Sequence, residues 1–346
     1  MTVKDRSAEF AALARVGIHL PGYVGYHADL LAMDAQTALI TTSSSGIPAY
    51  LANYIDPKFI EILTAPNKAA KIIGEAKKGD WTSQTLTFPV VEYTGEVSSY
   101  GDWAENGSAG LNQTFPQRQP YHYQTITQWG ERQLAMADLS KVDYAARMNQ
   151  ASANVLNKFQ NDTYFLGVAG LQNYGLLNDP ALSAAIAPGD KVFNSGASGP
   201  WITNGAVTAT AGEIYSDIQS IFSQLVSQTN GLIDMDSAMT LAMSPGSEVA
   251  LLTTNQYNVN VNDQLKKNFP NLKVETAPQY ATSGGNLVQL ILDNFEGQEV
   301  AECVYTEKMR AHAIIRDLSS YKQKKSQGSV GTVIYRPMAI AQMLGV

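Results

Sequence analysis

The chain has 346 residues, 45% of them hydrophobic, which is enough for two domains or for one elaborated domain with a sizeable core. Its formal net charge of −7 argues against a protein that coats nucleic acid through a broad basic face. The single cysteine, Cys303, excludes a scaffold of intrachain disulfides, and no apolar run approaches the roughly 20 residues that span a membrane.

Charged residues make up only 16% of the chain, and neutral polar residues take their place. A surface of this kind loses less hydration energy when another subunit covers it, although a soluble protein with a mild surface has the same composition. The first ten residues mix both charges and contain no apolar stretch of the kind found in a secretion signal. We therefore expect the chain to fold in the cytoplasm.

Residues 1 to about 50 are expected to form an arm, with weak helical patterns near 10–16 and 28–38. The small polar residues at 41–46 are typical of a linker. Two short helices are predicted to follow, the first at 57–63, where Pro57 suits the first turn, and the second at 68–76.

Two extended segments, 85–93 and 121–129, are predicted to be strands. The stretch between them, 98–119, is rich in Gly, Asn, Ser and Gln, so we expect the two strands to form one long hairpin with a polar tip. A two-stranded hairpin is marginally stable alone in water. It must therefore lie on something, and we favour a neighbouring subunit over the rest of the same chain.

A long helix of about 25 residues is predicted to follow a cap at Ser140 and to run to about Leu166, ending before Gly167. The tetrad Ser140 to Asp143 has the form of a capping box. Apolar residues then recur every three or four positions, which is typical of one packed face of a helix. This stripe consists of Tyr144, Met148, Ala151, Val155 and Phe159.

The second half of the chain alternates between helical and extended patterns, which indicates a compact α/β domain. Helices are expected at 211–228, 245–252 and 262–268. Strands are expected at 238–243, 272–275, 285–293 and 299–304. A last strand is expected at 330–337, where Pro337 marks a strand end, and the apolar residues 338–344 should pack into a core.

Motifs for catalysis or cofactor binding are missing from the sequence. The four histidines lack metal-ligand spacing, there is no G-x-S-x-G, and the glycines at 167, 170 and 175 fit backbone turns better than a phosphate loop. Cys303 lies in an alternating strand and is expected to be buried and inert. The pair Asp234 and Asp236 precedes a strand in a loop. We predict no catalytic, cofactor-binding or metal-binding residues and no enzymatic activity.

The order of the predicted elements resembles that of the tailed-bacteriophage major capsid proteins, whose fold is also found in the encapsulins. The most telling segments are 47–54, 81–133 and 138–180, above all the helix that runs into Phe165-Leu166-Gly167 and then Gly170-Leu171-Gln172-Asn173. The resemblance implies an α+β capsid fold. Its parts would be an N-terminal arm (1–55), short helices of the peripheral domain (56–80), an extended loop (81–135), the peripheral domain with its spine helix (136–184), an axial α/β domain (185–320) and a C-terminal strand that returns to the peripheral domain (321–346).

The resemblance also implies partners. Subunits would assemble as hexamers and pentamers into an icosahedral head that encloses double-stranded DNA without sequence-specific binding and without a membrane. Only about 50 residues precede the hairpin region, so we expect a separate scaffolding protein, or a mature chain, and a portal. Aromatic side chains of the extended loop are the candidate contacts between subunits, because interface cores are rich in aromatics and poor in charges. These are Tyr93, Tyr100, Trp103, Phe115, Tyr121, Tyr123 and Trp129.

Two alternatives remain open at this point. An encapsulin-like compartment would use the same fold to enclose cargo enzymes, and the neighbouring genes would identify it. A small-molecule enzyme or binding protein of α/β type would contain a concave pocket with convergent polar groups and shifted pKa values.

Overall fold

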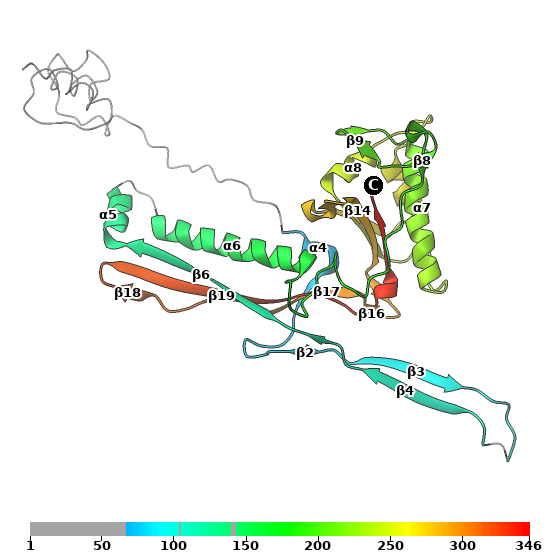
Figure 1. Ribbon diagram of the computed structural model, residues 1–346, viewed down its shortest axis with the longest axis horizontal. Coiled ribbons are helices and arrows are strands. Elements are labelled where there is room, and N and C mark those ends of the chain that lie inside the picture. The colour runs from blue at the N-terminus through cyan, green and yellow to red at the C-terminus, as the bar shows by residue number, and fades with distance from the viewer. Residues whose placement is uncertain (1–66, 104, 140–142) are drawn as a thin grey trace, which may run out of the picture. The chain divides into compact units, whose positions relative to one another are not determined.

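The computed structural model describes residues 67–103, 105–139 and 143–346 (Figure 1). The expected arm over 1–55 and the short helix at 57–63 lie outside the described residues. Within the second expected helix, at 68–76, the structure contains α4 (Ala69–Ile73), which ends at Gly74. No helix in the described ranges is long and apolar enough to cross a membrane.

A five-stranded sheet is built around the long strand β19 (Ser320–Ile334). Its other strands are β1 (Glu75–Lys77), β17 (Ala301–Ala311), β18 (Ile315–Asp317) and β6 (Tyr121–Gly130). The order is β1-β17-β19-β18, and β6 pairs antiparallel with β19 from Gly130↔Ser320 to Tyr121↔Ser329. The helix α5 (Glu131–Leu139) follows β6 directly. The sequence predicts only 330–337 of β19, because the first half of this strand is polar on both faces.

The long helix α6 (Tyr144–Leu166) packs on β19 and β6 of this sheet (Figure 1). Its predicted end is confirmed, but the helix begins at Tyr144 with Asp143 as the N-cap, whose carboxylate accepts a hydrogen bond of 3.0 Å from the Ala146 amide. The predicted cap, Ser140, lies outside the described residues. Because α6 has 23 residues, it is about 35 Å long.

The predicted apolar stripe of α6 contacts the sheet only in part, through Phe159, whose ring lies 4.6 Å from that of Tyr123 on β6. Val155 and Phe159 are 61% and 39% exposed. The helix also meets the sheet through hydrogen bonds, because the facing side chains of β19 are polar. Thr163 Oγ1 lies 3.1 Å from Ser329 Oγ, and Thr332 Oγ1 donates to the Tyr164 carbonyl at 2.7 Å.

A tight turn follows α6, and a glycine is essential in it. A Cβ placed on Gly175 would lie 2.2 Å from the backbone carbonyl of Phe165, so no other residue fits there without displacing the chain. Beyond this close approach, the Thr332 amide donates to the Tyr174 carbonyl at 2.9 Å. The glycines after the helix therefore serve the packing of the turn on β19, as expected from the missing phosphate-loop pattern.

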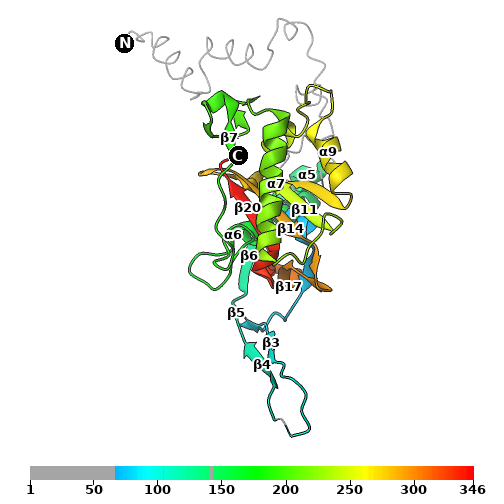
Figure 2. The ribbon, with the colours of Figure 1, turned by 90° about the vertical axis from the view of Figure 1, so that its right-hand side faces the viewer.

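A second five-stranded sheet has the order β12-β11-β14-β13, and β20 pairs with β14 on the other side. Its strands are β11 (Met239–Met243), β12 (Leu272–Thr276), β13 (Ala281–Thr282), β14 (Gly285–Leu292) and β20 (Ile340–Leu344). The helix α7 (Ala211–Gln228) lies beside β14 and β20 (Figure 2). Two shorter helices, α8 (Pro245–Ala250) and α9 (Val261–Asn268), connect the strands.

The sequence predicts this half of the chain well. The expected helix at 211–228 is confirmed with both ends, since Thr210 and Glu213 form a complete capping box. The expected strand at 238–243 is confirmed as β11, all of whose residues are buried. Short strand pairs complete this half: β7 (Asp190–Lys191) with β8 (Ala197–Ser198), β9 (Ile202–Thr203) with β10 (Ala206–Val207), and β15 (Asn294–Phe295) with β16 (Gln298–Glu299).

Sheet membership differs from the boundary expected at residue 320. β17, which begins at Ala301, already belongs to the first sheet, and β20 joins the second sheet rather than returning to the first. The chain therefore passes between the sheets near 293–300 and again near 335–339. The two sheets share one hydrophobic core, in which Phe165 at the end of α6 meets Tyr280 edge-on, with ring centroids 5.9 Å apart.

The hairpin exists, but its second strand is not the predicted one. β3 (Val90–Glu96) pairs with β4 (Ser108–Thr114), which lies inside the stretch expected to be a polar tip. Below it, β2 (Leu86–Thr87) pairs with β5 (Gln117–Arg118), and Pro89 separates β2 from β3. The segment expected as the second strand is β6, which pairs with β19 instead. β4 carries no alternating apolar pattern, so only its backbone hydrogen bonds define it as a strand.

Candidate inter-subunit surface

The β3–β4 hairpin has no packed face. Every residue of both strands is exposed, and the exposed fractions of Tyr93, Tyr100 and Trp103 are 86%, 93% and 97%. A folded chain rarely leaves several aromatic side chains uncovered in one short segment. Three of the predicted contact residues are therefore available to another molecule.

All charged side chains of the hairpin are acidic. Residues 90–114 contain four carboxylates, Glu92, Glu96, Asp102 and Glu105, and no lysine or arginine. At the tip, the Tyr100 hydroxyl donates to Asp102 Oδ1 at 2.8 Å, and Ser98 Oγ donates to the Asn106 carbonyl at 2.6 Å. These bonds give the tip a defined course, while the unneutralised charge favours a basic partner surface.

The base of the hairpin is tied to the turn after α6. Arg118 donates to Asp179 Oδ2 at 2.7 Å, and its guanidinium lies over the Tyr174 ring. The Asp179 side chain is fully buried, so this ion pair is little screened by water. The Gln119 amide donates to the Gln172 carbonyl at 2.9 Å. The hairpin thus projects from a fixed base.

The other four predicted contact residues lie outside the two strands of the hairpin. Phe115 and Tyr121 are 56% and 36% exposed, and Tyr123 is half-buried against Phe159, with ring centroids 4.6 Å apart. Burial raises the pKa of the Tyr123 hydroxyl, and the Glu75 carboxylate adds to this. Trp129 is only 6% exposed and stacks on Tyr321, so it belongs to the core of its own chain and is not available as a surface contact.

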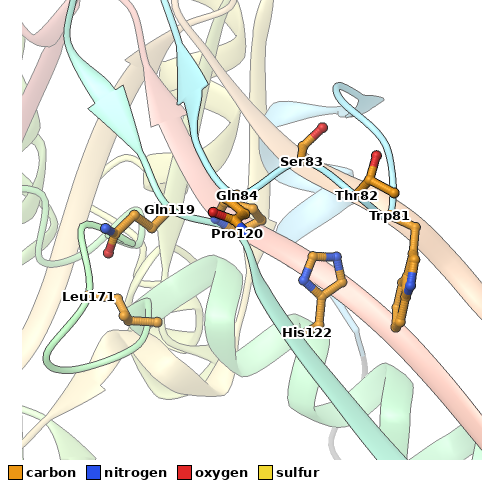
Figure 3. Close-up of a pocket in the computed structure, with 8 residues that line it drawn as sticks. All are labelled: Trp81, Thr82, Ser83, Gln84, Gln119, Pro120, His122 and Leu171. Atoms are coloured by element: carbon orange, nitrogen blue, oxygen red, sulfur yellow. The ribbon is translucent and has the colours of Figure 1, made fainter.

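A hollow of about 530 Å³ lies where the hairpin joins β6 (Figure 3). Trp81 and His122 meet edge-on in it, with ring centroids 4.5 Å apart, and His122 Nε2 lies 3.3 Å from Thr306 Oγ1. The remaining lining is neutral: Thr82, Ser83, Gln84, Gln119, Pro120 and Leu171. Apart from His122, the hollow is therefore lined by side chains that carry no ionisable group.

Acid is expected to weaken the packing around His122. Burial lowers the pKa of His122, and the Glu307 carboxylate opposes this only in part. Because the folded state disfavours the protonated ring, its contribution to stability is complete above the usual histidine range near 6.5 and declines as the pH falls through it. The unfolding midpoint between pH 7.5 and 5 should fall less in His122→Gln than in the wild type. Equal slopes in both proteins would contradict this reading.

A groove of about 1090 Å³ runs between the hairpin and the end of β19. Lys78 bonds to both Glu302 and Tyr335 at its wall, and the Tyr335 hydroxyl donates to Glu302 Oε2 at 3.1 Å. A hydrogen bond with Glu302 raises the pKa of Glu299. In the described part of the chain, no group of three His, Cys, Asp or Glu side chains is placed to hold a metal ion.

The residues considered for chemistry are not brought together. Cys303 is fully buried, and burial raises the pKa of its thiol, so it is unreactive as expected. Asp234 and Asp236 are exposed in the loop before β11. Among the described residues, the aromatic side chains and carboxylates of the hairpin are the most exposed such group.

A family model described as Pa193 gp26 major capsid protein matches residues 38–345. The chain belongs to this family of major capsid proteins. The capsid protein is a structural protein of the virion and not an enzyme, and the family assignment favours a phage shell over an encapsulin-like compartment. No curated protein matches the chain.

Solved structures share the α+β fold of tailed-phage capsids at low sequence identity. The capsid of Myoviridae phage XM1 matches with a TM-score of 0.69 and 15% identity over 88% of this chain and 100% of that one. The capsid of a native GTA particle matches with a TM-score of 0.56 and 11% identity, covering 88% of this chain and 99% of that one. A structure from Mycobacterium phage Adephagia matches with a TM-score of 0.55 and 11% identity, covering 90% of this chain and 96% of that one.

Reasoning from sequence missed one feature of the capsid protein that the structure makes evident. Residues 306–325 contain six basic and two acidic residues, a formal net charge of +4, in a chain whose net charge is −7. They form the end of the first sheet that includes β18. A windowed charge count would have found both this basic end and the acidic hairpin.

Proposed function

We propose that the capsid protein assembles head to tail, as hexamers and pentamers, into an icosahedral shell in which the hairpin of each subunit lies on the next. The observation that carries this proposal is the hairpin itself, an acidic element whose aromatics are almost fully exposed. In this arrangement the shell encloses double-stranded DNA without sequence-specific contacts, and it forms in the host cytoplasm with a separate scaffolding protein and a portal.

The same proposal divides the chain into the arm (1–55), the extended loop (81–135), the peripheral parts (56–80 and 136–184), the axial part (185–320) and the C-terminal segment (321–346). The sheet pairings support moving β17 from the axial to the peripheral part and β20 from the peripheral to the axial part. Six aromatics are proposed as contacts between subunits. They are Tyr93, Tyr100, Trp103, Phe115, Tyr121 and Tyr123.

The basic end at residues 306–325 is the surface that fits the hairpin. Lys308, Arg310 and Lys324 are exposed there, beside exposed apolar side chains such as Ile315 (66%) and Leu318 (92%). Within one chain, β6 separates β18 from the base of the hairpin by ten residues, about 30 Å, whereas Arg310 lies nearer the base, with its guanidinium 5.9 Å from the centre of the Trp81 ring. A second copy can present its basic end to the hairpin, and such a heterologous contact closes into a ring.

Reversing the charges of either the hairpin or the basic end is expected to block assembly. Reversing the charges of both in one chain is expected to restore it. Glu96→Lys with Glu105→Lys places cations opposite the basic end, and Arg310→Glu with Lys324→Glu does the converse. Each double variant should lower the yield of closed shells, seen by negative-stain electron microscopy with the scaffolding protein present, by about tenfold or more.

Glu248→Lys, at an exposed position of α8, is the matched control and should assemble normally. Normal shells from the Arg310→Glu, Lys324→Glu variant would remove the basic end as the receiving surface. If those shells packaged less DNA, the basic end would face the genome instead. Uniform small particles under every condition, from the unaltered chain, would contradict the shell proposal itself.

A further inference from the structure

The hairpin tip contains a pair of residues with a known tendency to react spontaneously. The sequence has three Asn-Gly pairs, which begin at Asn106, Asn204 and Asn230, and all three asparagines are exposed. In such a pair the backbone nitrogen of the glycine can reach the side-chain carbonyl carbon of the asparagine, because glycine has no Cβ in the way. How readily each pair reacts depends on how the fold holds the glycine amide.

The fold restrains two of the three pairs. The Gly231 amide donates to the Val226 carbonyl at 2.9 Å in the turn after α7, so this bond must break before the nitrogen can react. Asn204 and Gly205 form the two-residue turn between β9 and β10, with φ of 51° and 79°, and the pairing of the two strands holds this turn. In both pairs the reaction therefore needs a local opening of the backbone.

The pair at the hairpin tip lacks this restraint. Asn106 and Gly107 lie between the strands β3 and β4, and no acceptor for the Gly107 amide lies among the described residues. The turn itself favours glycine at this position. Gly107 has a φ of 97°, and a Cβ there would lie 3.2 Å from Ser98 Oγ. The conformation of the tip therefore keeps the reactive pair, because a bulkier residue that would slow the reaction fits poorly.

We propose that Asn106 is a site of spontaneous deamidation, which adds a fifth carboxylate to the hairpin. The Gly107 nitrogen, after losing its proton to hydroxide, forms a bond to Asn106 Cγ. The side-chain amino group then leaves as ammonia, taking its extra proton from water. One water molecule of the solvent opens the resulting cyclic imide. Opening at the side-chain carbonyl gives aspartate, and opening at the backbone carbonyl gives isoaspartate.

Both products place a negative charge at the tip, and isoaspartate suits the surroundings of Asn106. In isoaspartate the main chain runs through the former side chain, so the former backbone carbonyl becomes the free carboxylate. Ser98 Oγ already donates to this carbonyl at 2.6 Å, and a hydrogen bond to a carboxylate is stronger. The added charge would strengthen the attraction of the hairpin to the basic end at 306–325, a consequence that rests on the proposed assembly.

Peptide mass spectrometry of the free, full-length subunit tests the proposal. After incubation in mildly alkaline buffer, the deamidated fraction is measured at all three Asn-Gly pairs of the same sample. Asn106 should deamidate at least about fivefold faster than Asn230, because Asn230 reacts only after the hydrogen bond of Gly231 has opened. Asn106→Gln is the matched variant. It keeps an amide at the tip and should stay unmodified, because its longer side chain closes a ring far more slowly.

The same measurement in urea identifies the cause of the difference. Once the chain is unfolded, the three pairs should react at similar rates, because no turn or strand pairing then holds the glycine amides. Equal rates at the three pairs of the folded subunit would overturn the proposal. So would an Asn106 that stays unmodified while Asn230 or Asn204 reacts. The subunit need not assemble in this experiment, so its outcome is independent of the proposed shell.

Discussion

Replacing Tyr93, Tyr100 and Trp103 with serine is expected to abolish shell assembly and leave the fold of the subunit unchanged. The three side chains are 86–97% exposed, so their removal takes no packing from the chain itself. In an interface, buried aromatic anchors of this kind contribute about 2 kcal/mol or more each. Every subunit repeats the contact, so the loss recurs at each hairpin of the shell.

Two measurements on the triple variant separate assembly from folding. Electron microscopy should show free subunits or small oligomers in place of shells, and the thermal unfolding midpoint of the unassembled chain should match that of the wild type. Trp129→Ser is the contrasting variant, because the same residue type is buried there against Tyr321. It should lose about 3–5 kcal/mol of folding stability. Shells at wild-type yield from the triple variant would exclude the hairpin aromatics as assembly contacts.

Local sequence patterns predict where the helices and strands of this chain lie better than they predict which strands pair. The ends of α7 follow from Thr210 and Glu213 at the start and from the apolar periodicity that ends at Gln228. β11 follows from its short buried run. These features depend on residues a few positions apart. The pairing of β6 with β19 joins residues nearly 200 positions apart, and no local pattern contains it.

The hairpin shows a second limit of local patterns, because one of its strands has no such pattern. Its strand β4 has the sequence Ser-Ala-Gly-Leu-Asn-Gln-Thr, which lacks the alternation that a half-buried strand requires. Because neither side of β4 is buried, no selection for alternation operates within the subunit. The sequence points to the aromatic candidates because Tyr and Trp side chains recur there in a segment that is otherwise polar and poor in charges. The prediction of Trp129 as a contact between subunits fails because it assigns 121–129 to the hairpin, whereas these residues belong to β6.

The stripe of α6 illustrates how periodicity identifies a surface without identifying what covers it. The spacing of Val155 and Phe159 correctly indicates one apolar side of a helix, but the sheet of the same subunit contacts the neighbouring side. Polar residues of β19 select the polar side of α6, through contacts such as Thr163 with Ser329. The apolar stripe then stays largely exposed in the described part of the chain.

A large loss of stability is expected from Asp217→Ala. Asp217 and Lys191 form an ion pair of 2.7 Å in which both side chains are almost fully buried. Asp217 also accepts hydrogen bonds from the Gly189 amide at 2.8 Å and from Trp201 Nε1 at 2.6 Å. One carboxylate on α7 therefore fixes the course of the segment from β7 to β9. Its removal leaves a buried ammonium group without a counter-charge, which costs about 3–5 kcal/mol.

Chemical denaturation of the unassembled chain measures this effect, and a second variant identifies its cause. Lys191→Met combined with Asp217→Leu removes both charges and should recover part of the loss, since a neutral pair of similar volume needs no solvation. Lys273→Met is the matched control, because its ion pair with Asp293 is exposed at Lys273 and should contribute at most about 1 kcal/mol. If Asp217→Ala were no less stable than Lys273→Met, the buried pair would not be what holds this segment on α7.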